Sequence, residues 1–402
     1  MKVVALGTYP IKYPIHGGQR RVTAFRNAYI ARGYDHHYIA LYDPGSYKLG
    51  DVNPIDIPTD PAYSSFPDVP FITDLEAGRY FAFNNEAFQA LASRITQLQP
   101  DFLVLEHPFL WPFVKRYLAD LRRPISVIYS SHNVEGRLKY DILRLTGNVR
   151  PAVADRVKTT IDECEIDLCR NSKVVIAVSE DDARFYAEEA GCGDRVIVIR
   201  NGIDYSPWIR TSSEVSKIFD GPYFVFVGSA YPPNIEGFDH FVLKNRLYFL
   251  PPRKSLAVCG GASDGVFQLN RYLGHLASYS ERVHFFPKID DDALSSLKTK
   301  AHAFLLPIQT GGGSNLKTAE ALVSGKWVIT TSVALRSFDE YRDAPGVIIA
   351  DSPAAFGEAM IDVYHRPPLI LTDDQIAYRR RVTWESLFQS AEAERFFDAL
   401  KC

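Results

Sequence analysis

A glycine-rich segment in the second half of the chain brings a lysine and a carboxylate to the start of a predicted helix. It runs from Pro307 to Glu320 and follows the apolar run 303–306. Consecutive glycines let backbone N–H groups approach a ligand, and a helix N-terminus attracts negative charge. A loop with ordinary helix caps is the alternative, but this combination favours an anion-binding site. Its candidate residues are Gly312, Gly313, Ser314, Asn315, Leu316, Lys317 and Glu320.

A second glycine loop lies near the N-terminus. The segment 15–21 follows the first apolar run and opens a predicted helix. The paired Gly17 and Gly18 would let the backbone approach a ligand, with His16 and Arg21 beside them. A flexible loop without a function is an equal alternative. Because the segment does not match the GxGxxG pattern, it argues against a dinucleotide-dependent dehydrogenase.

Histidines follow two further apolar runs in the first half. His132 comes after the run 126–129, and Glu106 and His107 follow the run 102–105. A histidine at the carboxyl end of a strand is well placed to hydrogen-bond a polar ligand. A structural role, such as capping the next helix, is the alternative at both places.

Short turns end other apolar runs in the second half. Gly228 and Ser229 follow the run 223–227, and Lys288 and Ile289 come just after the run 283–286. The acidic triplet 290–292 could be interpreted as a metal site, but acidic residues at a helix N-terminus stabilise the helix by themselves. We therefore predict neither a metal ion nor a cofactor.

The elements that must position these loops alternate between short apolar runs and helical periods. The runs 102–105 and 303–306 are apolar throughout, which is typical of strands buried on both faces. Phe88, Leu91 and Ile95 recur between such runs at helical spacing. Strands alternating with helices predict parallel, doubly wound α/β sheets. The ligands of such sheets bind beyond the carboxyl ends of the strands, where the loops above lie.

The length of 402 residues suits two domains. The turn-rich segment 201–207 interrupts the alternation, which then restarts, so we predict a hinge near residue 205. The first domain would cover 1–205 and the second 206–383, with the cleft between them as the default ligand site. Apolar residues at helical spacing after Trp384 predict a C-terminal helix over about 384–402.

Composition argues against several classes of protein. A hydrophobic fraction of 46% and a net charge of −3 are ordinary for a soluble protein and give no reason to expect a nucleic-acid partner. The five cysteines form no CxxC pair, which predicts reduced thiols in a cytoplasmic protein. The chain enters a strand-like run at Lys2, and no apolar run could span a bilayer. The slightly basic first 150 residues are compatible with peripheral contact at the inner face of a membrane.

The order and spacing of these motifs resemble those of the retaining, family-4-type glycosyltransferases (glycosyl transferases group 1) of the GT-B fold. The resemblance covers most of the chain. Gly17 and Gly18 with Arg21 resemble the N-terminal glycine loop of the family, and the segment 131–135 resembles its histidine loop. The segment 311–330 is similar to its most diagnostic stretch, and 233–237 is similar to the opening of its nucleotide-binding domain.

The resemblance implies two Rossmann-like domains that face a central cleft, with the C-terminal helix crossing back to the first domain. The first domain would bind the acceptor and the second the nucleotide sugar. Glu320 would hold the donor ribose, and the 287–289 turn would meet the base. His132 would contact the transferring sugar, and Lys317 would balance the charge of the diphosphate. The other implied donor-binding residues are Gly17, Gly18, Gly228, Ser229, Lys288, Ile289, Gly312, Gly313, Ser314, Asn315 and Leu316, and the acceptor candidates are His16, Arg21, Glu106 and His107.

Two positions depart from the family pattern. Gly312 occupies the place of a glutamate that usually contacts the donor sugar, and Ser229 occupies that of a common arginine. Lys317, with Arg20 or Arg21, is then the candidate to supply charge to the diphosphate. We interpret the departures as a variant of the family pattern rather than as a loss of activity, and they leave the identity of the donor sugar open.

The resemblance implies sugar transfer from a UDP- or GDP-type donor to a glycan, lipid-linked or other hydroxyl acceptor, in surface polysaccharide or glycoconjugate synthesis. The sequence shows no carboxylate pair of the kind that retaining hydrolases use. The implied mechanism is front-face attack, in which the leaving phosphate takes the proton of the acceptor. Catalysis then depends on the positioning of the two substrates and on positive charge near the leaving phosphate. Two alternatives remain: a sugar-nucleotide epimerase of the same fold, and a non-catalytic protein that binds sugar nucleotides.

Overall fold

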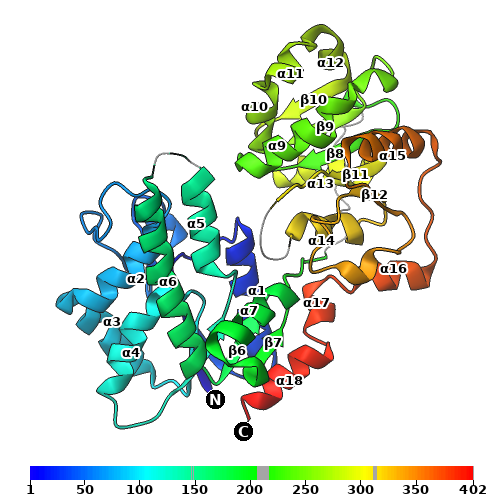
Figure 1. Ribbon diagram of the computed structural model, residues 1–402. Helices are drawn as coiled ribbons and strands as arrows, with labels where there is room; N and C mark the ends of the chain where they lie inside the picture. The colour runs from blue at the N-terminus through cyan, green and yellow to red at the C-terminus, as the bar shows by residue number, and fades with distance from the viewer. Residues whose placement is uncertain (146, 148, 206–216, 311–314, 402) are drawn as a thin grey trace. The chain divides into compact units, whose positions relative to one another are not determined.

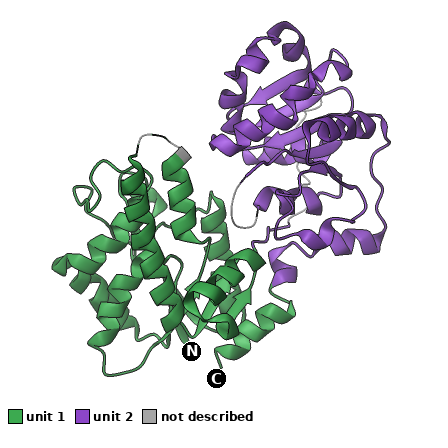
Figure 2. Ribbon diagram, viewed as in Figure 1, with its two compact units in different colours: residues 1–200, 388–402 green, residues 201–387 purple. Residues whose placement is uncertain are grey.

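The structure is a computed structural model that describes residues 1–145, 147, 149–205, 217–310 and 315–401 (Figure 1). The chain divides into two compact units (Figure 2). Unit 1 comprises Met1–Arg200 and Phe388–Cys402, and unit 2 comprises Asn201–Leu387. Within the described residues, no helix combines the length and the apolar character needed to cross a membrane.

Unit 1 is built on a seven-stranded parallel sheet in the order β3-β2-β1-β4-β5-β6-β7. Its strands are β1 (Lys2–Gly7), β2 (Asp35–Tyr42), β3 (Ile57–Pro58), β4 (Phe102–Leu105), β5 (Ser126–Ser130), β6 (Val174–Ala177) and β7 (Val196–Val198). Its helices are α1 (Gly17–Ala31), α2 (Thr73–Phe83), α3 (Asn85–Leu98), α4 (Trp111–Ala119), α5 (Glu135–Leu145), α6 (Pro151–Asn171), α7 (Glu180–Ala190) and α18 (Ala391–Ala399).

Unit 2 contains a second parallel sheet, of six strands, in the order β10-β9-β8-β11-β12-β13. Its strands are β8 (Phe224–Val227), β9 (Leu256–Cys259), β10 (Val283–Phe286), β11 (Ala303–Leu306), β12 (Trp327–Thr330) and β13 (Val347–Ile349). Its helices are α9 (Pro232–Phe241), α10 (Ala262–Phe267), α11 (Asn270–Leu273), α12 (Leu276–Arg282), α13 (Asp291–Lys300), α14 (Leu316–Val323), α15 (Pro353–His365), α16 (Asp373–Arg380) and α17 (Trp384–Leu387).

The apolar runs of the sequence form the central strands of both sheets, as predicted. All four residues of β4 are buried, and so are all four of β11, because helices cover both faces of a doubly wound sheet. Capping residues set where the helices begin. Asn84 accepts hydrogen bonds from two backbone N–H groups of α3, and the Ser179 hydroxyl accepts one from Asp182 of α7. The two parallel α/β sheets predicted from the alternation are confirmed.

The C-terminal helix returns to unit 1, as the family resemblance implied. Phe396 and Phe397 of α18 pack against Tyr29 of α1, with ring centroids 6.0 and 5.5 Å apart. The Arg32 guanidinium donates to the Phe388 carbonyl and the Glu394 carboxylate at 2.5 and 2.7 Å. The predicted single helix is nevertheless two, α17 and α18. The Ser390 hydroxyl accepts a hydrogen bond from Ala393, so a new helix begins there.

Candidate functional site

The strand order of each sheet reverses direction at one place, and several of the candidate residues lie near it. In unit 1 the reversal lies between β1 and β4, and in unit 2 between β8 and β11. Loops that leave neighbouring strands at such a point turn to opposite faces of the sheet and open a crevice between them, where ligands of open α/β sheets bind. The two clusters belong to separate units.

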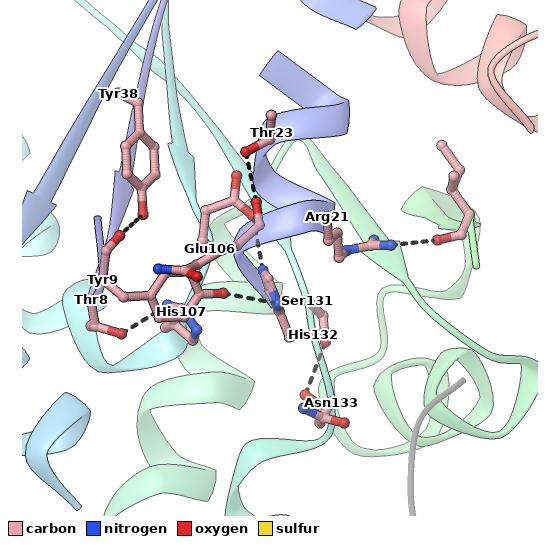
Figure 3. Close-up of polar contacts among 12 residues, drawn as sticks. Thr8, Tyr9, Arg21, Thr23, Tyr38, Glu106, His107, Ser131, His132 and Asn133 are labelled. Atoms are coloured by element: carbon pink, nitrogen blue, oxygen red, sulfur yellow. Dashed lines mark hydrogen bonds and ion pairs between the residues drawn. The ribbon is translucent and has the colours of Figure 1, made fainter. Parts of the chain in front are cut away.

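The unit 1 cluster gathers side chains from the ends of three neighbouring strands (Figure 3). Tyr9 follows β1, His107 follows β4, and His132 follows β5. The rings of His107 and His132 stack with centroids 4.9 Å apart, and the Tyr9 ring meets His107 edge-on at 5.0 Å. The Thr8 hydroxyl lies 3.3 Å from Nδ1 of His107, and this contact bridges the reversal point between β1 and β4.

His132 is held by protein contacts at both ring nitrogens. Its Nε2 lies 3.1 Å from Oε2 of Glu106, and its Nδ1 lies 3.3 Å from the Tyr9 hydroxyl (Figure 3). The His132 side chain is only 8% exposed, and that of Glu106 3%. In this arrangement neither ring nitrogen is directed at solvent, so a sugar would meet the backbone or the carbon edge of His132.

Burial sets the protonation of this pair. It raises the pKa of Glu106 to about 7, although the Ser130 hydroxyl and the Arg21 guanidinium oppose the rise. Burial also holds the pKa of His132 well below its usual value, with Arg21 and His16 adding to the effect. The contact has the geometry of an ion pair, but both pKa shifts favour the uncharged partners. His132 is therefore neutral near neutral pH, and Glu106 is close to the midpoint of its ionisation.

A buried carboxylate supports the loop that carries His132. Glu165 of α6 accepts hydrogen bonds from the Tyr129 and Tyr186 hydroxyls at 2.6 and 2.9 Å. Its other oxygen accepts from the backbone N–H of Glu135 at 3.0 Å, at the start of α5. The Ser131 hydroxyl lies 2.6 Å from that of Tyr186. Hydrogen bonds thus hold the chain in place on both sides of His132.

The start of α1 completes the unit 1 cluster. His16 caps this helix, because its Nδ1 accepts from the backbone N–H of Gln19 at 3.4 Å. Gly18 lies against Tyr9, and a Cβ there would meet the Tyr9 hydroxyl at 2.3 Å. Arg21 is buried, and its guanidinium donates to the Ile199 carbonyl at 3.0 Å. His16 thus caps α1 and Gly18 allows the close approach of Tyr9, while their roles in ligand binding stay predictions.

The unit 2 cluster joins the ends of β8 and β11 through a lysine. Nζ of Lys317 donates to the Asn234 side-chain oxygen at 2.5 Å. The Asn234 side-chain nitrogen in turn donates to the carbonyl and hydroxyl oxygens of Ser229, at 3.1 and 3.2 Å. Burial lowers the pKa of Lys317 to about 8, while the nearby Glu320 opposes the fall. A lysine held in this way offers a positive charge beside the first turn of α14.

Glu320 lies one turn further along α14 and has a partner that sequence reasoning missed. Nζ of Lys298, on α13, donates to Oε2 of Glu320 at 2.7 Å. No motif pointed to Lys298, because α13 and α14 are separated by a strand and a loop. Asn315 caps α14 by accepting from the Lys317 backbone N–H at 3.2 Å.

Two family descriptions match the sequence. "Glycosyltransferase Family 4" matches residues 15–206, and "Glycosyl transferases group 1" matches residues 221–366. The chain belongs to the family 4 glycosyltransferases. It is therefore a retaining, metal-independent transferase that takes a sugar from a nucleotide sugar. No curated protein matches this sequence significantly.

Several solved structures have the same fold as this chain. Sucrose-phosphate synthase from Thermosynechococcus elongatus superimposes with a TM-score of 0.67 at 15% identity, covering 99% of each chain. Anabaena HepE, solved in complex with UDP, has a TM-score of 0.65 at 15% identity and covers 99% of this chain and 100% of its own. The lipopolysaccharide outer core galactosyltransferase WaaB has a TM-score of 0.62 at 13% identity, and the match covers 100% of this chain and 99% of WaaB. At these identities the likeness shows the GT-B fold.

The remaining predicted donor residues of this glycosyltransferase have different environments. Gly228 is buried and Ser229 exposed at the end of β8, and Lys288 is exposed after β10. Ile289 packs against a hydrophobic cluster of unit 2, and Leu316 is half-buried. Gly312, Gly313 and Ser314 lie outside the described residues. Within the described residues, no group of three or more histidine, cysteine or acidic side chains could hold a metal ion.

Proposed function

We propose that this glycosyltransferase binds a UDP- or GDP-type sugar donor in unit 2. It would transfer the sugar to a hydroxyl of a glycan or lipid-linked acceptor held by unit 1, in the synthesis of a surface polysaccharide or glycoconjugate. The observation that carries the proposal is the contact of Lys317 with Asn234 at the strand reversal of unit 2. HepE, which has the same fold, was solved with UDP and with UDP-glucose.

The donor chemistry follows from the charges near α14. Breaking the bond between the sugar and the diphosphate places negative charge on the leaving phosphate. Lys317 and the N-terminus of α14 would stabilise that charge, and Glu320 would hold the ribose. The 287–289 turn after β10 would meet the base. Front-face attack lets the leaving phosphate take the acceptor proton, so no protein nucleophile is needed.

The acceptor would meet the histidine cluster of unit 1. Burial disfavours a charge on both Glu106 and His132, so the cluster suits an uncharged sugar. Because both ring nitrogens of His132 have protein partners, the sugar would meet the backbone and the carbon edge of this residue.

Nucleotide binding tests the proposal directly. Purified protein is screened by thermal shift against UDP, GDP, ADP and TDP, and the affinity of the best ligand is measured at several pH values. A ligand that binds only the folded state raises the melting temperature. With its pKa at about 8, Lys317 is charged at neutral pH and mostly uncharged one pH unit above that value. The affinity should therefore fall about tenfold as the pH rises from about 7 to about 9.

Lys317→Met should weaken binding at neutral pH and flatten this pH profile. Lys300→Met, at the end of α13, is the matched control and should keep the wild-type profile. A Lys317→Met profile that still falls with pH would show that another group binds the diphosphate. A nucleotide sugar that is epimerised in the absence of an acceptor would favour the epimerase instead.

A further inference from the structure

Lys298 is a buried cation that the reaction as described does not use. It lies near the end of α13, whose following strand, β11, leads to the loop before α14. Its charge also acts electrostatically at the end of β9. There burial raises the pKa of Cys259 to about 12, and Lys298 opposes that rise. The positive charge of Lys298 thus acts at the carboxyl end of the unit 2 sheet, where the candidate donor residues also lie.

The contact between Lys298 and Glu320 restrains the carboxylate. The distance of 2.7 Å is that of a strong, charge-assisted hydrogen bond. The side chain of Lys298 is 8% exposed and that of Glu320 is 20% exposed, so solvent screens the pair only in part. Within the described part of the chain, Lys298 takes Oε2 of Glu320 and no residue hydrogen-bonds to Oε1. Oε2 of Glu320 is therefore held in place by Lys298, while Oε1 can still accept a hydrogen bond from a ligand.

Stability alone is a weak reason for such a pair. Removing two charges from water costs about as much as their attraction returns, and apolar replacements of buried pairs are often neutral or stabilising. A glutamate side chain free to rotate, in contrast, loses conformational freedom when a ligand immobilises it. Restraint by Lys298 before the ligand arrives would remove much of that loss.

We propose that Lys298 is a positioning residue: it fixes Glu320 through Oε2, so that Oε1 accepts a hydrogen bond from a ribose hydroxyl of the donor. The inference rests on the proposed role of Glu320 in donor binding. It assigns to α13 a part in distinguishing ribonucleotides from deoxyribonucleotides.

Discrimination against a 2′-deoxynucleotide tests this inference. Affinities for UDP, 2′-deoxy-UDP, GDP and 2′-deoxy-GDP are measured by calorimetry for wild type, Glu320→Ala, Lys298→Met and the control Lys300→Met. Wild type and the control should prefer the ribonucleotide about tenfold, the value of one hydrogen bond to a charged group. Glu320→Ala should bind both forms almost equally. Lys298→Met should lose most of the preference although it retains Glu320.

The variants distinguish the positioning role of Lys298 from the ribose-binding role of Glu320. If Glu320→Ala removes the preference and Lys298→Met keeps it, Lys298 has no positioning role and the proposed function stands. If Glu320→Ala itself keeps the preference, the ribose role of Glu320 is wrong and the inference fails with it. Should Lys298→Met not fold, Lys298→Gln retains a hydrogen-bond donor. It should show an intermediate preference, and a full wild-type preference there would overturn the inference.

Discussion

Two titratable groups with shifted pKa values stand out at the scale of single residues. Glu106 lies in unit 1 and Lys317 in unit 2, and burial moves the pKa of each toward neutrality, upward for the acid and downward for the base. A group with a pKa near the working pH changes its charge in response to small changes around it. A bound ligand should therefore shift both pKa values: an anionic diphosphate should raise that of Lys317, and a ligand that buries Glu106 further should raise that of Glu106.

Replacing Glu106 with glutamine should change how stability depends on pH. Its pKa rises from 4.5 to about 7 on folding, so the native state binds more protons than the unfolded chain between these values. The contribution of this group to the free energy of unfolding is then lost as the pH rises through that window, by up to about 1.4 kcal/mol per pH unit. Glutamine cannot ionise, so Glu106→Gln should gain stability relative to wild type as the pH rises.

Urea unfolding of both proteins between about pH 5 and about pH 7.5 measures this difference. Glu135 and Glu165 also have raised pKa values, but their contributions cancel when the two proteins are compared. A difference in stability that stays constant with pH would mean that Glu106 ionises as an ordinary exposed carboxylate does.

Glycines set how closely the elements approach one another around the two clusters. A Cβ on Gly237 of α9 would meet the Pro307 carbonyl oxygen at 1.9 Å, so only glycine lets this helix lie against the loop that leaves β11. Gly18 has the same role between α1 and Tyr9. The conformational freedom of these glycines matters less than the missing side chain.

Gly18→Ala should destabilise unit 1 by about 1–3 kcal/mol, because the new methyl group displaces the Tyr9 hydroxyl that contacts His132. Thermal unfolding measures the cost. Gly50→Ala is the matched control, because a Cβ there meets nothing within 4 Å. The double variant Gly18→Ala/Tyr9→Phe removes the clashing hydroxyl and should recover part of the stability. Equal costs for Gly18→Ala and Gly50→Ala would argue against a close approach of Tyr9.

The whole molecule consists of two units with separate hydrophobic cores. The core of unit 1 surrounds β1 and β4, and that of unit 2 surrounds β8 and β9. The chain enters unit 2 after Arg200 and returns to unit 1 at Phe388, so α18 belongs to unit 1 although it is last in sequence. Separate cores allow each unit to unfold in its own transition.

Phe396→Ala should destabilise unit 1 alone by about 3–5 kcal/mol, because the ring is fully buried against α1. Phe356→Ala, which removes a fully buried ring of the unit 2 core, is the matched variant. Calorimetry should show the first change lowering one transition and the second change the other. Whichever of UDP and GDP binds should raise the unit 2 transition. A single transition that responds equally to both substitutions would show that the two units unfold together.

Local patterns account for the elements that were predicted well. The runs 102–105 and 303–306 coincide with β4 and β11, because strands covered on both faces have apolar residues at every position. The edge strand β3 was missed, since two residues carry no periodicity. The break between α17 and α18 was also missed, because the helical spacing continues across Ser390 while the cap at that residue begins a new helix.

The sequence by itself determined the alternation of strands and helices, the family, and the loops at which candidate residues lie. Each of these depends on neighbours along the chain, which spacing records directly. Only the tertiary structure decided that Tyr9 and Glu106 hold His132, that Asn234 holds Lys317, and that Lys298 pairs with Glu320. These partners come from different elements. Their contacts and pKa values depend on the distances and burial that sheet packing creates, and spacing along the chain carries no record of either.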